Sequence, residues 1–188
     1  MCIRDSIYTI AVALKSEASS TNPSGMDVSR ENQQNGRRKM ALSAAIILAA
    51  GEGTRMRSNK PKVLHTLAGK TFLNRVMDSV AALDPDTLAV VVHYQAERVA
   101  EAARSYNEHV TIVDQDDIPG TGRAVQCAMA QLTQKDDLDG AVLIAASDMP
   151  LLDTDTLDQL LAFHEKSGNG ATCLLYTSPS PRDTERSR

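Results

Sequence analysis

Short apolar runs that alternate with amphipathic segments are the feature that most constrains the fold of this chain. The runs cover residues 44–48, 88–93, 110–113 and 141–146. They are rich in Val, Ile, Leu and Ala and too short to favour core helices, so they predict buried strands. The segments between them predict helices with Thr71, Thr121 and Thr154 as N-caps. Strands that alternate with helices predict an α/β fold with a parallel sheet.

Polar or glycine-rich loops follow three of the predicted strands. These loops contain Gly51, Gln115 and Asp148. The carboxyl ends of parallel strands meet at one edge of a sheet, and ligands of such sheets bind at that edge. We therefore expect the three loops to lie close together around one site.

The first of these loops favours a phosphate site. Gly51 and Gly53 allow a tight turn and a close approach of a ligand to the backbone, whose amides can face an anion. Arg55 and Lys62 add positive charge that can neutralise a polyphosphate during transfer. Met56 stands where a dinucleotide fingerprint needs its third glycine, and no P-loop motif is present, so neither a dehydrogenase nor a P-loop enzyme is supported.

The two later loops offer a metal ligand and a base-recognition group, and each also has a plain structural interpretation. Asp148 follows a strand directly, where a carboxylate suits Mg²⁺, but Asp is equally common in turns and caps. The Gln115 amide and the backbone near Gly120 and Thr121 can hydrogen-bond a base edge, although a surface loop would contain the same residues.

Composition argues against several other classes of function. The net charge is −4, and aromatic residues make up only 3% of the chain, which speaks against nucleic-acid binding. No apolar run is long enough to span a membrane. Cys2, Cys127 and Cys173 are scattered, which indicates neither a disulfide framework nor a zinc site and fits a reducing cytoplasm.

The two ends of the chain differ from its middle. Residues 1–40 lack sustained periodicity and predict disorder, apart from a weak signal-peptide-like run at residues 7–14. Residues 1–6 and 175–183 resemble translated sequencing-adapter DNA, although a natural disordered tail has a similar composition. We therefore expect one folded domain over residues 41–175, with ends at 1–40 and 176–188 that do not belong to it.

The motifs together resemble the uridylyltransferase domain of the GlmU family. Members of this family are bifunctional enzymes, N-acetylglucosamine-1-phosphate uridylyltransferases/glucosamine-1-phosphate N-acetyltransferases. The resemblance rests on residues 48–56 and 61–70, on Gln115 with residues 120–122, and on residues 148–151, within a match over about residues 44–174. It implies a Rossmann-like, GT-A nucleotide-diphospho-sugar transferase domain that is truncated here. Two positions depart from the family pattern: Arg123 replaces a common His, and Ser147 replaces a common Gly.

The resemblance also implies roles for particular residues. Arg55 and Lys62 correspond to catalytic cations, and Asp148 corresponds to a Mg²⁺ ligand. The residues that would contact the nucleotide or line its site are Leu48, Ala49, Ala50, Gly51, Gly53, Lys62, Gln115, Gly120, Thr121, Ala146, Ser147 and Asp148.

The implied reaction joins UTP and N-acetylglucosamine 1-phosphate into UDP-N-acetylglucosamine, a peptidoglycan precursor for the cell wall, with release of pyrophosphate. Sugar-contacting loops, a second metal ligand and a β-helix that forms a homotrimer would lie beyond residue 175, so we expect the chain itself to be inactive. Three alternatives stay open: a nucleotidyltransferase of the same fold with another nucleotide or sugar, a non-catalytic nucleotide-binding fragment, and a chain without function that exposes an apolar sheet edge.

Overall fold

The computed structural model describes residues 9–15, 41–53, 56, 58–134 and 138–175. The strands are β1 (Thr9–Lys15), β2 (Leu42–Leu48), β3 (Thr66–Leu67), β4 (Lys70–Thr71), β5 (Thr87–Val92), β6 (Thr111–Asp114), β7 (Ala141–Ala146) and β8 (Ala171–Leu175). The helices are α1 (Phe72–Ala81), α2 (Ala96–Tyr106), α3 (Thr121–Leu132) and α4 (Thr154–Ser167), with a short 3-10 helix, η2 (Lys62–Leu64).

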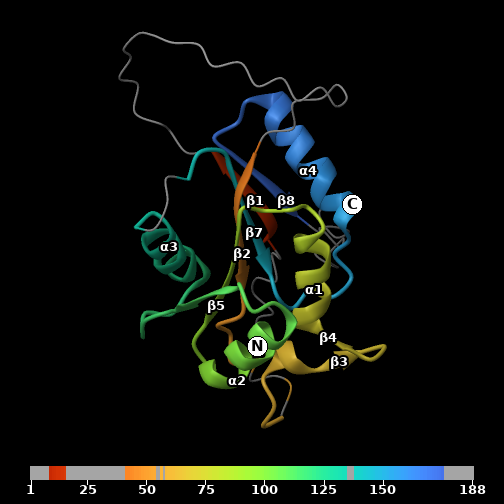
Figure 1. Ribbon diagram of the computed structural model, residues 1–188, viewed down its shortest axis with the longest axis vertical. Helices are drawn as coiled ribbons and strands as arrows, with labels where there is room; N and C mark the ends of the chain where they lie inside the picture. Colours follow the sequence, from red (N-terminus) through yellow and green to blue (C-terminus); the bar gives the residue numbers. More distant parts are fainter. Residues whose placement is uncertain (1–8, 16–40, 54–55, 57, 135–137, 176–188) are drawn as a thin grey trace, which may run out of the picture.

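One six-stranded sheet within these residues organises the domain, in the order β6-β5-β2-β7-β1-β8 (Figure 1). β2 pairs in parallel with both β5 and β7, and β5 pairs in parallel with β6. The predicted parallel arrangement is confirmed for these four strands. β8 forms one edge of the sheet, and β3 and β4 form a separate small hairpin.

The structure differs from the predicted disorder at residues 9–15, which form β1. This strand pairs antiparallel with β7 on one side and with β8 on the other, so the sheet is mixed. Its sequence, TIAVALK, is mostly apolar and includes β-branched residues, which suit a strand. β7 and β8 run in the same direction, and β1 lies between them. The backbone of β1 pairs with both strands and so satisfies the hydrogen-bonding groups on their facing sides. The rest of the predicted disordered ends lies outside the described residues.

Helices cover both faces of the sheet, and the buried residues of β2, β5 and β7 alternate between two cores. Ala45 and Ile47 belong to the core beneath α1, α2 and α4, whereas Ala44 and Ile46 belong to the core beneath α3. Figure 1 shows α3 on one side of the sheet and α1 with α4 on the other. Coverage of both faces explains why the strands are continuous apolar runs, since each fully buried Ile contributes about 1.5–3 kcal/mol.

Local capping starts the helices where the chain leaves each loop. The Thr71 hydroxyl accepts a 3.0 Å hydrogen bond from the Asn74 amide, which confirms Thr71 as the N-cap of α1. Asp153, not Thr154, caps α4, because its carboxylate accepts from the Thr156 amide at 2.7 Å. The prediction for Thr154 was therefore wrong by one residue, and a carboxylate directly before it provides the cap instead.

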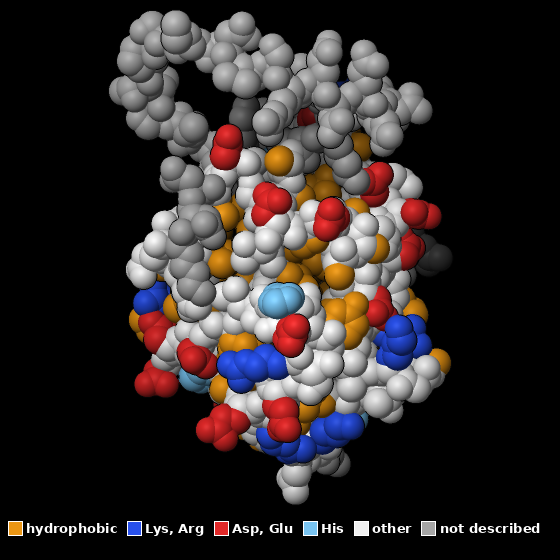
Figure 2. Space-filling model, viewed as in Figure 1, with side chains coloured by type: hydrophobic (Ala, Val, Ile, Leu, Met, Phe, Trp, Pro, Cys, Tyr) orange, Lys and Arg blue, Asp and Glu red, His pale blue; other side chains and the backbone are white. Residues whose placement is uncertain are grey.

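Charged side chains of both signs are spread over the domain. On the face shown in Figure 2, Lys and Arg side chains stand among Asp and Glu side chains and do not gather into one basic area. Among the described residues, no helix has the length and apolar character needed to cross a membrane.

Candidate active site

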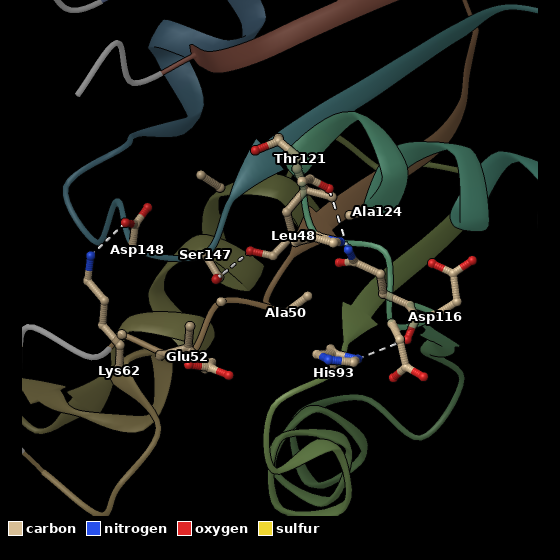
Figure 3. A pocket seen from close by; sticks show the side chains of 18 residues that line it. Leu48, Ala50, Glu52, Lys62, His93, Asp116, Thr121, Ala124, Ser147 and Asp148 are labelled. Carbon is tan, nitrogen blue, oxygen red and sulfur yellow. Dashed lines mark hydrogen bonds and ion pairs between the residues drawn. The ribbon is translucent and has the colours of Figure 1, made fainter. Parts of the chain in front are cut away.

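A cavity of about 620 Å³ opens where the chain leaves the carboxyl ends of β2, β5, β6 and β7. The loops that contain Gly51, Gln115 and Asp148 meet there, as the topology predicts (Figure 3). The volume falls in the range that small-ligand sites occupy. The edge of the sheet therefore provides a half-open cavity for a ligand.

Most of the site residues expected from the sequence line this cavity. They are Leu48, Ala50, Gly51, Gly53, Lys62, Gln115, Gly120, Thr121, Ala146, Ser147 and Asp148. Ala49 does not line it, because its side chain is buried in the core and its amide donates to the Val91 carbonyl at 2.8 Å. Arg55 lies outside the described residues.

Sequence analysis missed several further lining residues: Glu52, Val63, His93, Asp116, Asp117, Pro119 and Ala124. His93 follows the last residue of β5, so the rule that ligands bind at strand carboxyl ends would have found it. Asp116 and Asp117 lie between two predicted site residues, Gln115 and Gly120, and extending the site to the whole loop would have included them.

The glycine turn is shaped by its contact with Lys62. Gly53 has φ +63°, a left-handed conformation that favours glycine, and a Cβ there would lie only 2.6 Å from the Lys62 Cβ. By contrast, a Cβ at Gly51 would meet nothing within 4 Å. Lys62 follows Pro61, whose carbonyl accepts from the Leu64 amide at 3.0 Å as η2 begins. The absence of a side chain at Gly53 therefore lets Lys62 pack against the turn.

Lys62 reaches across the cavity to Asp148. The Lys62 Nζ lies 2.7 Å from Asp148 Oδ2, and the two side chains are 32% and 24% exposed (Figure 3). The pair joins the loop after β2 to the loop after β7. Asp148 is thus paired with a cation in the wall of the cavity.

The described lining is acidic apart from this lysine. Its carboxylates are Glu52, Asp116, Asp117 and Asp148, against the ammonium of Lys62. Two of these carboxylates are in ion pairs, Asp148 with Lys62 and Asp116 with Arg123, and Glu52 and Asp117 lie outside those pairs. A polyphosphate that entered together with a divalent cation would meet less repulsion from these carboxylates than a bare one.

Asp148 is the residue best placed to hold such a metal. No group of three or more His, Cys, Asp or Glu side chains forms a cation cage among the described residues. Mg²⁺ is commonly held by one or two carboxylates together with phosphate oxygens and water, and one carboxylate opening on a cavity suits that arrangement. The residues present fit a metal bound together with a polyphosphate.

The loop after β6 is fixed by hydrogen bonds within its own backbone and to the end of β5. The Gln115 amide donates to the Val92 carbonyl at 2.9 Å, and the Gln115 Nε2 donates to the Ile118 carbonyl at 2.8 Å. On the other side, the His93 Nδ1 lies 3.0 Å from the Gln115 carbonyl oxygen (Figure 3). The Gln115 side chain is therefore held in one orientation beside the cavity.

Helix α3 begins at the cavity wall. Gly120, with φ +132°, is its N-cap and makes no side-chain capping bond, while Thr121 is its first residue. The prediction that Thr121 caps this helix was wrong, because glycine adopts the conformation that the turn requires. The first amides of a helix lack intrahelical acceptors, so those near Thr121 are suited to a ligand's oxygen atoms.

Arg123 ties this loop to α3. Its Nε donates to Asp116 Oδ2 at 2.9 Å, and its Nη2 donates to the same carboxylate. These hydrogen bonds hold the pKa of Asp116 below its usual value and raise the pKa of Arg123. Arg123, a departure from the pattern of the resembling family, thus pairs with a carboxylate of the cavity wall.

Comparisons with known proteins support a nucleotide-handling site. The chain is 98% identical over 142 residues to the bifunctional protein GlmU of Bifidobacterium adolescentis, and 84% identical to that of Bifidobacterium longum subsp. infantis. Each match covers 76% of this chain and 31% of the relative, so the chain spans about a third of the length of these curated relatives. The resemblance found in the sequence is confirmed.

A solved structure gives the same class of fold. A nucleotidyl transferase from Methanothermobacter thermautotroptrophicus (Mth528) is similar with a TM-score of 0.53 and 27% identity, covering 63% of this chain and 56% of that one. Residues 45–180 match the family described as the MobA-like NTP transferase domain. That match includes the glycine turn, Lys62, Gln115 and Asp148, and the chain belongs to this family of nucleotidyltransferase domains.

Proposed function

We propose that this chain binds UTP with a divalent cation, as the nucleotide-binding part of a site that transfers the uridylyl group to N-acetylglucosamine 1-phosphate. The observation that supports this best is the meeting of the glycine turn, the Lys62–Asp148 pair and the Gln115 loop in one cavity. The similarity to GlmU proteins supplies the substrate pair.

The proposed reaction needs positioning and charge neutralisation more than covalent catalysis. A phosphate oxygen of the sugar phosphate attacks the α-phosphorus of UTP. The bond from this phosphorus to the oxygen that bridges the α- and β-phosphates breaks, and pyrophosphate leaves with that oxygen. UDP-N-acetylglucosamine forms, and no protein group is covalently modified.

The loop after β2 would receive the phosphates. Gly51 leaves open space beside the backbone for an anion, and Gly53 makes room for Lys62, whose ammonium pairs with Asp148. In this proposal Lys62 and Arg55 are the catalytic cations. Asp148 would hold Mg²⁺, which would supply positive charge to neutralise the phosphates.

The loop after β6 would select the base. Because the Gln115 Nε2 donates to Ile118, its Oε1 is left as the acceptor, and it has no partner among the described residues. Uracil offers an N–H donor at position 3, whereas cytosine offers an acceptor there, so the fixed amide favours uracil. The proposed nucleotide contacts also include Leu48, Ala50, Gly120, Thr121 and Ala146. Ala49, whose side chain is buried in the core, and Ser147, whose hydroxyl donates to the Leu48 carbonyl, would support this wall and not touch the nucleotide.

The wider setting follows the same proposal. We place the protein in the cytoplasm, in the synthesis of the cell-wall precursor UDP-N-acetylglucosamine. Cys127 and Cys173 are free thiols, which fits a reducing compartment. Assembly as a trimer rests on the family resemblance alone.

Calorimetric titration of the 188-residue chain with UTP, CTP and GTP, with and without MgCl₂, tests this function. We expect UTP to bind only weakly without Mg²⁺ and at least about tenfold more tightly than CTP with it. Stronger binding of CTP or GTP would indicate another nucleotidyltransferase. A nucleotide affinity that changes neither on addition of Mg²⁺ nor in the Asp148→Ala variant would indicate a non-catalytic nucleotide-binding fragment. Pyrophosphate release after addition of N-acetylglucosamine 1-phosphate then tests catalysis.

A further inference from the structure

Ser147 is a buried polar residue between a core strand and the proposed metal ligand. It follows the last residue of β7, precedes Asp148 and is only 2% exposed. Polar side chains at such burial need a hydrogen-bond partner. The identity of that partner indicates what the side chain does.

Both donors of Ser147 reach one carbonyl oxygen. The Leu48 carbonyl accepts from the Ser147 amide at 3.1 Å and from the Ser147 Oγ at 2.6 Å (Figure 3). Leu48 ends β2, and the next amide, that of Ala49, donates to the Val91 carbonyl of β5 at 2.8 Å. The peptide from which the glycine turn departs is therefore held by both neighbouring strands.

We propose that Ser147 is a positioning residue whose buried hydroxyl fixes Asp148 relative to the glycine turn. A backbone N–H alone engages one lone pair of the Leu48 carbonyl, and the hydroxyl engages it a second time from a side chain adjacent to Asp148. The role differs from a nucleotide contact, because the hydroxyl donates to the protein. The inference rests on the proposed function for the claim that this geometry serves a metal–nucleotide complex.

Ser43 provides a matched control at the amino end of the same strand pair, β2 and β7. It is 5% exposed, and its Oγ donates to the Asp139 carbonyl at 2.6 Å, which joins β2 to the residues that precede β7. Each serine is buried, joins β2 to the chain next to one end of β7, and donates from its Oγ to a backbone carbonyl at 2.6 Å. They differ in that only Ser147 is next to the cavity.

The test compares Ser147→Ala and Ser43→Ala in the full chain. We expect both to lower the urea midpoint by similar amounts, because each loses one buried hydrogen bond. Titration with UTP should show that Ser147→Ala weakens the Mg²⁺-dependent binding by about three- to tenfold and leaves the Mg²⁺-free binding nearly unchanged. Ser43→Ala should change neither. A general loss of folding would weaken both kinds of binding together.

Amide hydrogen exchange provides a second readout that needs no ligand. Peptides that cover residues 50–53 should exchange faster in Ser147→Ala and at the wild-type rate in Ser43→Ala. Equal UTP binding in the two variants, or unchanged exchange in Ser147→Ala, would overturn the positioning role. If the wild-type chain does not bind UTP, the proposed function fails, and the exchange rates alone decide whether Ser147 positions the turn.

Discussion

The two ends of the β2–β7 strand pair use the same packing devices for different purposes. Each end has a buried serine with a 2.6 Å bond to a carbonyl, and each has a glycine with positive φ and no room for a Cβ. At the amino end, the group nearest to that missing Cβ is the Ala41 carbonyl, 2.4 Å from where the Cβ of Gly140 would lie. At the carboxyl end it is the Cβ of Lys62, which pairs with Asp148. The same combination of a buried serine and a glycine thus serves only packing at the amino end, whereas at the carboxyl end it positions Lys62 and Asp148.

Substitution of the two glycines should give the largest effects and separate the two purposes. Gly140→Ala places a methyl group against backbone, so we expect a loss of about 2–5 kcal/mol in the free energy of unfolding. Gly53→Ala should also cost about 2–5 kcal/mol, because the Lys62 Cβ that the methyl group would meet is fixed to the backbone and cannot be moved by rotation of the side chain. Urea denaturation measures both. Only Gly53→Ala should also weaken UTP binding in the folded protein, and equal weakening by Gly140→Ala would break the comparison.

Asp148→Asn tests the carboxylate at the carboxyl end. We expect the Mg²⁺-dependent part of UTP affinity to fall by about 100-fold, because an amide is a poor ligand for a hard cation. The free energy of unfolding should change by less than about 1 kcal/mol, since the ion pair is partly exposed. Asp139→Asn is the control at the amino end, where only the backbone carbonyl is used. Retention of Mg²⁺-dependent binding in Asp148→Asn would contradict the proposed metal ligand.

Lys62→Met should have opposite effects on the two ligands of the site. Removal of the ammonium frees Asp148, so Mn²⁺ alone should bind about two- to fivefold more tightly by electron paramagnetic resonance. UTP with Mg²⁺ should bind about tenfold more weakly, because a charged donor to the phosphates is lost. Lys70→Met removes a similar 2.7 Å pair with Asp78 outside the cavity and should change neither. Weaker binding of both Mn²⁺ and UTP by Lys62→Met would contradict the idea that Lys62 leaves Asp148 to bind the phosphates.

The smallest effect concerns the Asp116–Arg123 pair. The pKa of Asp116 in the folded protein is lowered by Arg123, so this pair stabilises the loop above the ordinary Asp value of about 3.9 and is lost as pH falls through the folded value. Arg123→Met should raise this pKa toward 3.9, as seen by carboxyl NMR titration. Asp153, whose pKa is lowered by the Thr156 hydroxyl and amide, should titrate unchanged. An unmoved Asp116 would show that Arg123 does not hold the loop.

The sequence predicted those elements whose signal is local. The strand at residues 141–146 was found because six apolar residues stand between polar segments, and Thr71 was found because its hydroxyl directly precedes an amphipathic helix. The carboxyl-edge rule also brought the three loops to one cavity. These features depend on few neighbours, so pattern and propensity suffice.

Features that depend on distant partners were missed. β1 pairs with β7 and β8, and the sequence of residues 9–15 alone does not show that these partners are present. The Asp153 cap replaced the predicted Thr154 because two capping residues are adjacent, and only the backbone conformation chooses between them. His93 and Glu52 were missed for another reason: each lies at a predicted strand end or next to a predicted site residue, but neither belongs to a motif that singled it out.

An amide NMR titration of the full chain with UTP and MgCl₂ tests the central claim most directly, because it compares the two ends of the strand pair in one experiment. The account predicts shifts for Gly51, Gly53 and Asp148 at the carboxyl end, and none for Ser43 or Gly140 at the amino end. Shifts confined to the amino end, or no shifts at the carboxyl end at saturating UTP, would contradict the assignment of this cavity as a metal–nucleotide site.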